Sequence, residues 1–474
     1  GKSKKFKLHL CVDNSSILVM ENIQNKSSKS LLARRYQIAI LSFFGFFNVY
    51  ALRVNLSIAV VKMTEEIEAE DTHLNNYTYR EFDWDSKQQG LLLSSFFYGY
   101  IVTQIPGGWL APYVGAAKLF GFGILATALA TLFTPVIARA GLEALIAVRI
   151  LEGLFEGVTF PAMHALWSNW APPMERSRLA TIGYSGNYVG TVVAMITCGF
   201  LAEHAGWESV FYVYGVVGVI WCSIWLYTVK ESPALDKNIS SEERNYIESS
   251  IGVLEEKGST PWRSILMSFP VWAIIAAHFS ENWGFYTLLT QLPTFLSDVT
   301  KFKLDKTGFM AAIPYLAMAV AVQGGGLLAD LLRTRFNVST TWVRKLFTCS
   351  AFIGQTVFML ATAFTFSPTV AVAFLTLAVG FGGFAWAGFS VNHLDIAPKY
   401  ASLLMGLSNT FATIPGIISP GLTGIIVQDK EAESWHIVFY ISAAIYLLGG
   451  IFYLIFASGE RQKWACAADE IEMA

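Results

Sequence analysis

Charged residues are scarce in this sequence. Asp, Glu, Lys and Arg make up 14% of its 474 residues, and 54% are hydrophobic, whereas soluble domains carry about 25% charged residues. So little charge argues against an ordinary soluble domain and indicates a membrane protein. The formal net charge of −2 gives no basic excess, so no nucleic-acid partner is expected.

The sequence also lacks the signatures of catalytic, metal and cofactor sites. Its five cysteines are scattered, without the spacing of a disulfide or zinc framework. It contains no glycine-rich phosphate loop and no nucleophile–His–acid order that favours catalysis. We therefore expect no enzyme activity, no cofactor and no metal site. The first long apolar run begins at Tyr36 and is too long for a signal-peptide core, so no cleaved secretory signal is expected.

Long runs without Asp, Glu, Lys or Arg are the main feature that is present. A membrane-spanning helix needs about 20 apolar residues, and only helices of that length satisfy their own backbone in lipid. Three apolar segments are interrupted by charge, at 36–61, 142–170 and 271–295. With the uninterrupted runs, one of which is long enough for two helices, they predict an all-α, polytopic membrane protein with twelve transmembrane helices. The uninterrupted runs are 88–117, 119–138, 179–202, 209–229, 307–329, 346–394 (the double one), 400–428 and 434–459.

The positions of the basic residues predict the orientation. Residues 1–35 hold eight Lys or Arg and two acids, whereas the loop 63–87 holds eight acids and two Lys or Arg. Basic segments stay in the cytoplasm, so both termini are predicted to be cytoplasmic and the loop to face the other side. Its sequon at Asn76 is a predicted glycosylation site. The expected division is a tail (1–35), a six-helix bundle (36–229), a linker (230–270), a second six-helix bundle (271–457) and a tail (458–474).

The two predicted bundles share short sequence matches. "GWLAP" at 108–112 is similar to "GLLAD" at 326–330, and "HALWSNWAP" at 164–172 is similar to "HLDIAP" at 393–398. The two offsets are nearly equal, and each match falls at the same place in its half. A repeat of six helices plus six is typical of transporters, whose substrate site lies near the midplane between the halves.

Longer motifs carry a resemblance to a known family. "GLLADLLRTR" resembles the loop signature of the major facilitator superfamily. The resemblance implies gating roles for Asp330 and Arg333 of this sequence. In the first half, Pro112 replaces the expected aspartate. "FFGFFNVYALRVNLSIAVV", "SFFYGYIVTQIPGG", "RILEGLFEGVTFPAMHALWSNWAPP" and "FSVNHLDIAPKYASLLMG" resemble the anion/phosphate transporter family, which includes sialin, type I phosphate transporters and vesicular glutamate transporters. The resemblance covers residue 34 to about residue 464 and implies the major facilitator fold.

Four ionisable side chains lie in the stretch 149–164 of the interrupted segment 142–170: Arg149, Glu152, Glu156 and His164. At about 100° per residue they fall within an arc of about 120° on one helix face, which must face the bundle interior. Pro161 is expected to bend the helix. Two carboxylates beside one arginine leave a negative charge in excess, which favours proton uptake. The alternative is a purely structural ion pair between Arg149 and Glu152. The resemblance implies proton coupling by both glutamates, with His164 near the cytoplasmic mouth.

Arg53 is a second buried cation, about 12 Å from the end of its segment. A guanidinium in a transporter cavity suits an anion, because it binds a carboxylate through two hydrogen bonds, and the resemblance implies this role. The alternative is an ion pair with Glu152 or Glu156. Further substrate contacts are expected from Tyr50, Tyr98, Tyr286, Ser390 and Asn392. His278 and His393 are equally well explained as core histidines, and a gate formed by His393 with Asp395 remains an alternative.

These observations predict a monomeric proton-coupled symporter of organic anions, such as sialic acid, other acidic sugars or related monocarboxylates. The vesicular glutamate transporters have a basic residue at the position of Glu281. This sequence lacks that basic residue, which weakens the case for a dicarboxylate substrate. A Na+-coupled transporter of phosphate or organic anions is one alternative, and an anion channel is another from a different class. Lysosome or other endomembranes and plasma membrane both remain open as the location.

Overall fold

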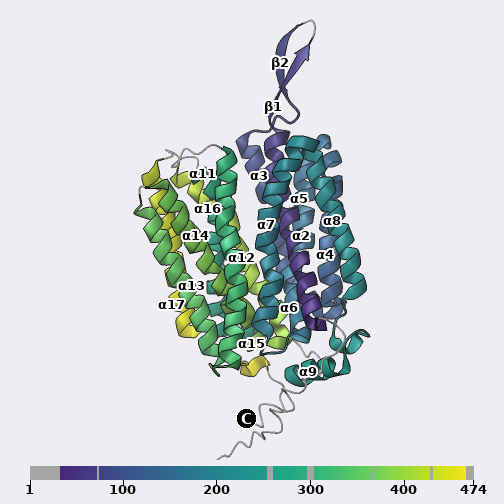
Figure 1. Ribbon diagram of the computed structural model, residues 1–474, viewed down its shortest axis with the longest axis vertical. Helices are drawn as coiled ribbons and strands as arrows, with labels where there is room; N and C mark the ends of the chain where they lie inside the picture. Colours follow the sequence, from purple (N-terminus) through teal and green to yellow (C-terminus); the bar gives the residue numbers. More distant parts are fainter. Residues whose placement is uncertain are drawn as a thin grey trace, which may run out of the picture.

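The computed structural model describes the residues 32–71, 74–252, 260–295, 304–365, 367–427 and 431–465. Long helices make up nearly all of this structure, as predicted (Figure 1). Nine helices of the described residues are long and apolar enough to cross a membrane by length and composition alone. Three more membrane-length segments complete the predicted twelve: α3, the broken pair α5 and α6, and α11, which carries Glu281.

The first half of the chain supplies six membrane-length segments. They are α2 (Arg34–Met63), α3 (Ser86–Val114), α4 (Ala116–Ala140), α5 (Leu142–Glu156) with α6 (Thr159–Trp170), α7 (Arg176–Ala205) and α8 (Trp207–Thr228). The short helices η1 (Pro233–Leu235), α9 (Ser241–Ile251) and α10 (Trp262–Leu266) follow.

The second half supplies the other six. They are α11 (Phe269–Phe295), α12 (Leu304–Thr334), α13 (Thr340–Ala363), α14 (Pro368–Ala385) continued by the π-helical segment η3 (Trp386–Ser390) and α15 (Val391–Ile396), α16 (Ala401–Ile426) and α17 (Ala432–Phe456). Two short 3-10 helices, η4 (Pro398–Tyr400) and η5 (Lys463–Ala465), precede α16 and follow α17.

Three links in the first half consist of a single glycine. Gly115 joins α3 to α4, Gly141 joins α4 to α5, and Gly206 joins α7 to α8. Their φ angles are 104°, 133° and 81°, values that strain any residue with a Cβ. Glycine therefore lets the chain reverse within one residue, which keeps the neighbouring helices in contact.

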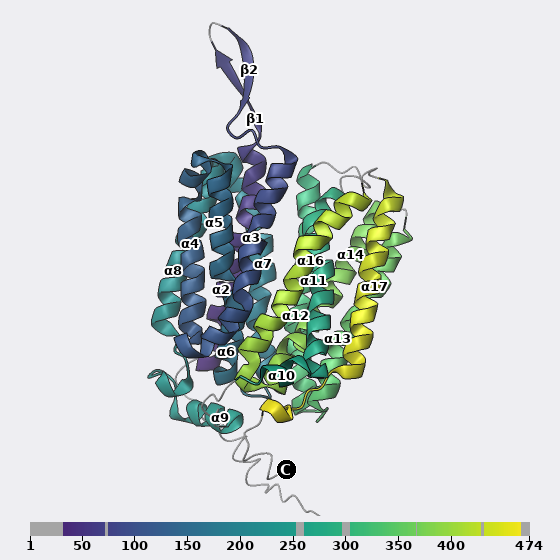
Figure 2. The ribbon, with the colours of Figure 1, turned by 180° about the vertical axis from the view of Figure 1, so that it is seen from behind.

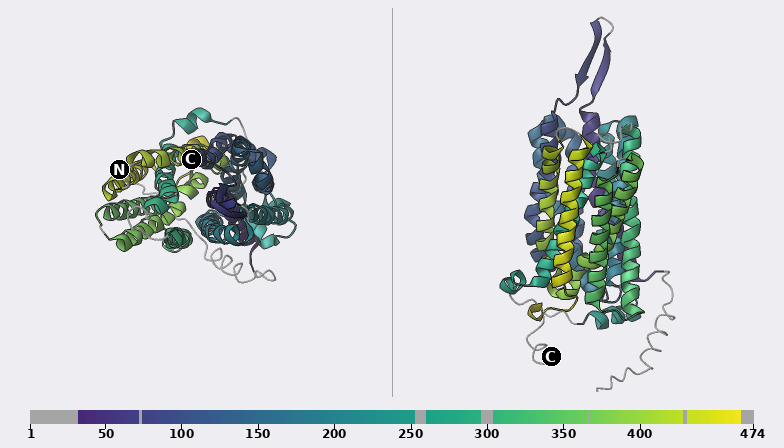
Figure 3. Two further views of the ribbon diagram at one scale, coloured as in Figure 1. Left: turned by 90° about the horizontal axis from the view of Figure 1, so that it is seen from above. Right: turned by 90° about the vertical axis from the view of Figure 1, so that its left-hand side faces the viewer.

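The two halves repeat one packing pattern. In the first half α2 packs on α7 and α8, and α4 packs on α5 and α8; in the second, α11 packs on α16 and α17, and α13 packs on α14 and α17. These helices correspond by order, which confirms the predicted repeat of six plus six. The halves lie side by side and meet along two seams, α7 with α12 and α3 with α16 (Figures 2 and 3).

A two-stranded antiparallel hairpin projects from one end of the bundle (Figure 1). It consists of β1 (Glu66–Asp71) and β2 (Leu74–Arg80), with Glu66 opposite Arg80. This part of the chain was expected to be a loop, so the hairpin is a correction within an otherwise helical fold. We call this the hairpin end of the molecule and the opposite end, which carries α9, the α9 end.

The segment 142–170 is interrupted at Gly157 and Val158, where α5 ends and α6 begins. The expected bend was assigned to Pro161. The break lies four residues earlier because a proline has no N–H to bond to the carbonyl four residues before it. Close packing also explains Gly153 on α5, since a Cβ there would lie 2.0 Å from the carbonyl oxygen of Phe96 on α3. Small residues let these two membrane helices approach closely.

Helix α9 is bound to the start of α2. The Glu243 carboxylate accepts hydrogen bonds from the backbone N–H groups of Arg34 and Arg35, at 2.8 and 3.1 Å, and so caps α2. Glu175 accepts from Arg35 Nε at 2.9 Å and from the Tyr246 hydroxyl at 3.1 Å. We call the group Arg35, Glu175, Glu243 and Tyr246 the α9 latch.

Candidate functional site

A cavity of about 850 Å³ lies between the halves in the part of the molecule nearest the hairpin end. Its volume is in the range of ligand pockets, about 300–1,000 Å³. Of the described residues that line it, two are charged, and both are arginines, Arg53 and Arg149. The remaining lining residues are Val54, Ser57, Ile58, Leu93, Phe96, Phe97, Met195, Ile196, Tyr286, Leu288, Leu289, Thr290, Leu292 and Tyr315.

Arg53 is held by one carboxylate and three aromatic rings. Its Nε donates to Glu156 Oε1 at 2.8 Å, and its Nη2 also bonds to that oxygen. The guanidinium carbon lies 4.6, 4.9 and 4.7 Å from the ring centroids of Tyr50, Phe96 and Tyr100, within cation–π distance. No described residue accepts a hydrogen bond from Arg53 Nη1 or donates one to Glu156 Oε2. The pair therefore keeps a donor and an acceptor for another partner.

Arg149 forms a second ion pair beside the first. Its Nη1 donates to Glu152 Oε2 at 2.6 Å, and its Nη2 donates to the backbone carbonyl of Arg53 at 3.2 Å. Thr131 on α4 donates to Glu152 Oε1 at 2.9 Å. Glu152 and Glu156 are each 1% exposed, so both carboxylates lie behind the arginines instead of on the cavity wall.

This geometry corrects the expected charge balance. The sequence pattern predicts two carboxylates for one arginine, with one negative charge in excess. In the structure Arg53 supplies the second cation, so the cluster has two cations and two anions. Arg149 pairs with Glu152, and Arg53 pairs with Glu156 and not Glu152.

The other five predicted substrate contacts lie in four environments. Tyr286 lines the cavity, and Tyr50 covers Arg53. Tyr98 is not among the lining residues and is 42% exposed on the opposite side of α3 from the ion pairs. Ser390 and Asn392 are fully buried away from the cavity, where Asn392 Nδ2 donates to the Tyr453 hydroxyl at 3.0 Å.

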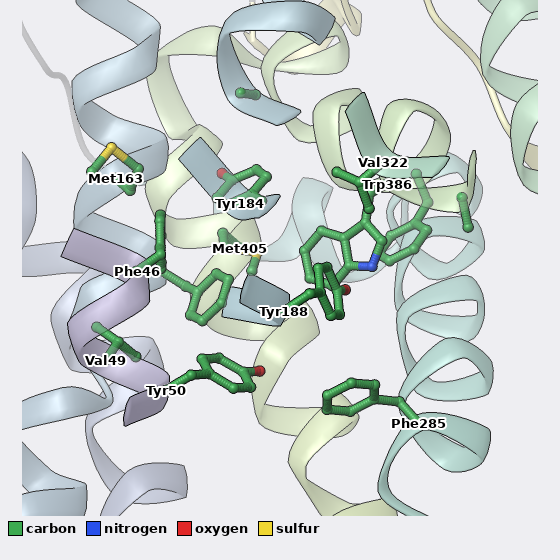
Figure 4. Close-up of a cluster of buried hydrophobic side chains, with 14 of the residues drawn as sticks. Phe46, Val49, Tyr50, Met163, Tyr184, Tyr188, Phe285, Val322, Trp386 and Met405 are labelled. Atoms are coloured by element: carbon green, nitrogen blue, oxygen red, sulfur yellow. The ribbon is translucent and has the colours of Figure 1, made fainter. Parts of the chain in front are cut away.

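An aromatic layer lies on the α9 side of the cavity and joins the halves. Tyr50 and Tyr188 of the first half face Phe285 of the second at centroid distances of 6.4 and 6.0 Å, and Tyr188 also faces Trp386 at 6.3 Å (Figure 4). Apolar contact between rings from both halves separates the cavity from the α9 end.

The predicted gating residues bridge the halves at the α9 end. Asp330 on α12 accepts hydrogen bonds from the backbone N–H groups of Ser177 and Arg178, at 3.3 and 2.8 Å. It therefore caps the first turn of α7, where a negative charge is favoured by the helix dipole. Arg333 Nη1 donates to the carbonyl of Pro173. Both contacts would have to break for this end to open.

A buried charge network lies beside these residues. Arg344 Nε donates to Asp395 Oδ2 at 2.6 Å, and Arg344 Nη1 donates to Ser177 Oγ at 2.8 Å across the seam. Arg176 contacts Asp395 Oδ1 at 3.4 Å from the other half. Asp395 thus pairs with arginines and not with His393, which lies 2.8 Å from Ser408 Oγ.

The second seam connects directly to Arg53. Asn409 on α16 donates to the Tyr100 hydroxyl and to Gln104 Oε1, both at 2.9 Å. Tyr100 also covers the Arg53 guanidinium, so one side chain touches both the cavity cation and the opposite half. On the same seam, Ser402 donates to the carbonyl of Gly108 at 2.8 Å.

His164 is part of this closed interface and does not lie at an open mouth. It is fully buried, and its Nε2 lies 3.0 Å from the carbonyl oxygen of Ser390 in the other half. Its Nδ1 lies 3.1 Å from the carbonyl oxygen of Phe160 and 2.9 Å from the Tyr184 hydroxyl. Its contacts therefore join the two halves.

The sequence does not single out three aromatic residues of the site. Phe96, Tyr100 and Tyr315 contact Arg53 or line the cavity. Each is an ordinary aromatic residue in an apolar run, so the sequence contains no signal that separates it from core residues. The described residues contain no group of three His, Cys, Asp or Glu arranged to hold a metal ion.

Comparison with known proteins identifies the family. The sequence matches the model of the Major Facilitator Superfamily over residues 38–420. The chain belongs to this superfamily. Within the superfamily it is 48% identical to sialin from Homo sapiens, over 91% of this chain and 90% of sialin. It is 47% identical to vesicular glutamate transporter 1 from Bos taurus, over 92% of this chain and 79% of that protein.

Solved structures of superfamily members share the fold. The proton:xylose symporter XylE matches with a TM-score of 0.69 at 13% identity, over 91% of this chain and 98% of that chain. The E. coli fucose:proton symporter FucP matches with a TM-score of 0.63 at 16% identity, over 90% and 100% of the two chains. The predicted resemblance and fold are therefore confirmed. As a superfamily member with transporters as relatives, the protein is a multi-pass membrane transporter and not an enzyme.

Proposed function

We propose that this protein is a proton-coupled symporter of organic anions that works by alternating access. One observation carries the proposal: among the described residues that line the cavity, the charged ones are two arginines, and each is neutralised by a buried glutamate behind it. The cavity therefore attracts an anion only when one of the two arginine–glutamate ion pairs breaks.

Proton uptake is the step that releases the arginine. When Glu156 or Glu152 gains a proton, its charge-assisted bond to Arg53 or Arg149 is lost, and the substrate carboxylate replaces it. The loaded cavity then holds one more proton and one more anion than before, so its net charge is unchanged. Keeping the charge constant avoids an added desolvation penalty when the cavity closes around its contents.

Closure at the hairpin end and opening at the α9 end complete the cycle. The contacts of Asp330 and Arg333 with the start of α7 separate, as does the bond between His164 and Ser390. His164, freed from Ser390, then helps to pass the proton from Glu156, about 12 Å away along the helix, towards the open α9 end. The ionised glutamate reclaims its arginine, and the substrate leaves.

The substrate class follows from the number of cations. Two arginines in the first half and an acidic Glu281 in the second suit one carboxylate with hydroxyl or amide groups, such as an acidic sugar or another monocarboxylate. Tyr286 and Tyr315 can donate to such groups. The relatives named sialin, at 48% identity, and vesicular glutamate transporter 1, at 47%, support an organic anion as the substrate.

The cell location is part of the same proposal. We propose that the protein is a monomer in a lysosomal or other endomembrane or in the plasma membrane, with both termini in the cytoplasm. The α9 end is then cytoplasmic, and the cavity opens to the lumen or the outside. Protons drive the anion towards the cytoplasm.

Uptake into proteoliposomes tests the function. With radiolabelled N-acetylneuraminate and a panel of monocarboxylates, an imposed proton gradient should drive accumulation above equilibrium, and a protonophore should abolish it. Accumulation driven by a sodium gradient at equal pH would instead establish Na+ coupling. Strictly downhill flux under every gradient would contradict a symporter, as the channel alternative requires.

A further inference from the structure

Glu281 is a buried acid that the mechanism above leaves unused. It lies on α11 in the second half and is 1% exposed. No described residue donates a hydrogen bond to its Oε2, and the ion pairs of the described residues do not include it. Glu152 and Glu156, by contrast, each contact an arginine. A carboxylate buried without a cation is strongly destabilised as long as it is ionised.

Its surroundings form a small polar chamber. A cavity of about 10 Å³ is bordered by Glu281, Gln355, Tyr315 and Tyr446, which is space for about one water molecule. Gln355 Oε1 and the Tyr315 hydroxyl also lack a hydrogen-bond partner among the described residues. A Cβ at Gly382 would lie 2.6 Å from both Glu281 Oε1 and Gln355 Nε2, so glycine at this position makes room for the two polar groups.

The chamber adjoins the main cavity. Tyr315 and Leu288 line both, so these two side chains separate the chamber of Glu281 from the space where substrate binds. A movement of either side chain would connect Glu281 with the cavity.

The groups that face Glu281 from neighbouring helices supply no positive charge. They are the neutral Gln355 on α13 and the tyrosines Tyr315 on α12, Tyr446 on α17 and Tyr188 on α7. On α11 itself His278 lies 3.1 Å from Ser408 Oγ on α16, and His393 on α15 bonds to the same hydroxyl. Helix α14 contributes Gly382 and Val379.

We propose that Glu281 is a second proton-binding site, which must be neutral before an anion enters the cavity. The proposal rests on the function proposed above and extends it to the second half. The arginine–glutamate cluster is balanced, so an ionised Glu281 leaves one net negative charge near the cavity and repels the substrate. Protonation forms an O–H bond at Oε2, taking the proton from the side to which the cavity is open. The new hydroxyl group donates into the chamber.

Infrared difference spectroscopy between acidic and mildly alkaline pH tests the site without any substrate. The purified wild-type protein should show the C=O stretching band of a buried carboxylic acid. Glu281→Gln should lose this component, and Glu281→Asp should retain it at a shifted frequency. Glu248→Gln, at an exposed ion pair on α9, is the matched control and should leave it unchanged. A band that is identical in wild type and Glu281→Gln would overturn the proposal, whatever the protein transports.

Anion binding across pH tests the consequence. With N-acetylneuraminate as the probe, Glu281→Gln should bind about tenfold more tightly than wild type near neutral pH and equally at acidic pH, because one repelling charge is removed. Glu281→Asp should restore the wild-type pH profile. Parallel assays in sodium and choline salts identify the cation. Tighter binding in sodium by wild type and not by Glu281→Gln would show a Na+ site and contradict the proton assignment, as would an unchanged pH profile in Glu281→Gln.

Discussion

At the scale of single residues, the site is a pair of arginine–glutamate contacts with spare bonding capacity. Arg53 Nη1, Arg149 Nε and Glu156 Oε2 have no hydrogen-bond partner among the described residues, although each is buried. Buried polar groups normally have partners, and an unpaired one is costly. These three atoms are therefore poised to bind a substrate or a proton.

Arg53→Lys should abolish most transport without unfolding the protein. Lysine keeps the charge but loses the planar fork that binds a carboxylate through two bonds. Losing one charge-assisted hydrogen bond costs about 1.5–3 kcal/mol, so substrate affinity should fall roughly 10- to 100-fold. Uptake assays with size-exclusion profiles of the same preparations measure both parts. Uptake of an anion close to wild type would rule out Arg53 as the primary contact.

Glu152→Gln and Glu156→Gln should separate binding from coupling. Glutamine imitates a permanently protonated glutamate, so anion binding should persist while proton-driven accumulation is lost and only exchange remains. Thr131→Val is the matched control, because it removes a neutral contact of Glu152 and should keep coupling. Accumulation with wild-type pH dependence in both glutamine variants would show that these carboxylates are structural.

The sequence predicts these polar residues better than it predicts their partners. Helical periodicity places Arg149, Glu152 and Glu156 on one face, and all three are buried together. The partner of Glu156 lies 103 residues away in the chain, beyond the reach of any local pattern. Tyr98 illustrates the same limit, since Phe97 lines the cavity and the next residue does not. Successive residues of a helix point about 100° apart, so of two neighbouring aromatic residues only one faces the cavity and can contact the substrate.

At the scale of helices and strands, the hydrophobic runs predict the membrane helices well and the short elements poorly. The segment 142–170 begins and ends where α5 begins and α6 ends. The hairpin was missed because the sequence of β1, "EIEAED", is rich in residues that are depleted in strands. The bounds of the two bundles, the linker and the tails stay predictions.

The α9 latch should tolerate acidic conditions. Burial alone would raise the pKa of Glu175, but hydrogen bonds and charges from Arg35 and Arg178 outweigh it and lower the pKa to about 2. Because the folded-state pKa lies below the unfolded value of about 4.5, the contribution of Glu175 to stability is complete above that value. It is lost only as pH falls towards 2.

Glu175→Gln should therefore loosen α9 at every pH above about 4.5. Removing the charge takes from Arg35 one of its two carboxylate partners and leaves only Glu243, and the free energy of unfolding should fall by roughly 1–3 kcal/mol. Hydrogen–deuterium exchange of α9 measures the effect, and Glu248→Gln on its exposed side is the control. If α9 exchanges as slowly in Glu175→Gln as in wild type, Glu175 does not hold the latch.

At the scale of the whole molecule, the orientation can be tested with sugars. Asn76 lies in β2 at the hairpin end, whereas Asn238 and Asn337 lie near α9 and just before α13, at the other end. We expect a glycan on Asn76 alone among these three, because glycosylation occurs on the side away from the cytoplasm. Asn76→Gln should remove the shift that a glycosidase causes on gels. A shift that persists there and disappears in Asn337→Gln would reverse the orientation.

The single-glycine links have a further consequence for the chain as a polymer. Within the first half, a break in the chain at Gly115, Gly141 or Gly206 would disconnect two neighbouring helices that are linked by that one residue. The connection between the halves is different, because it runs from Val229 to Ser268 through short helices at the α9 end, and α9 stays bound to the first half by the latch. The gene could therefore be divided between α9 and α10 and expressed as two polypeptides. The two seams should bring the two polypeptides together as a working transporter. A gene divided at Gly141 should yield no working transporter.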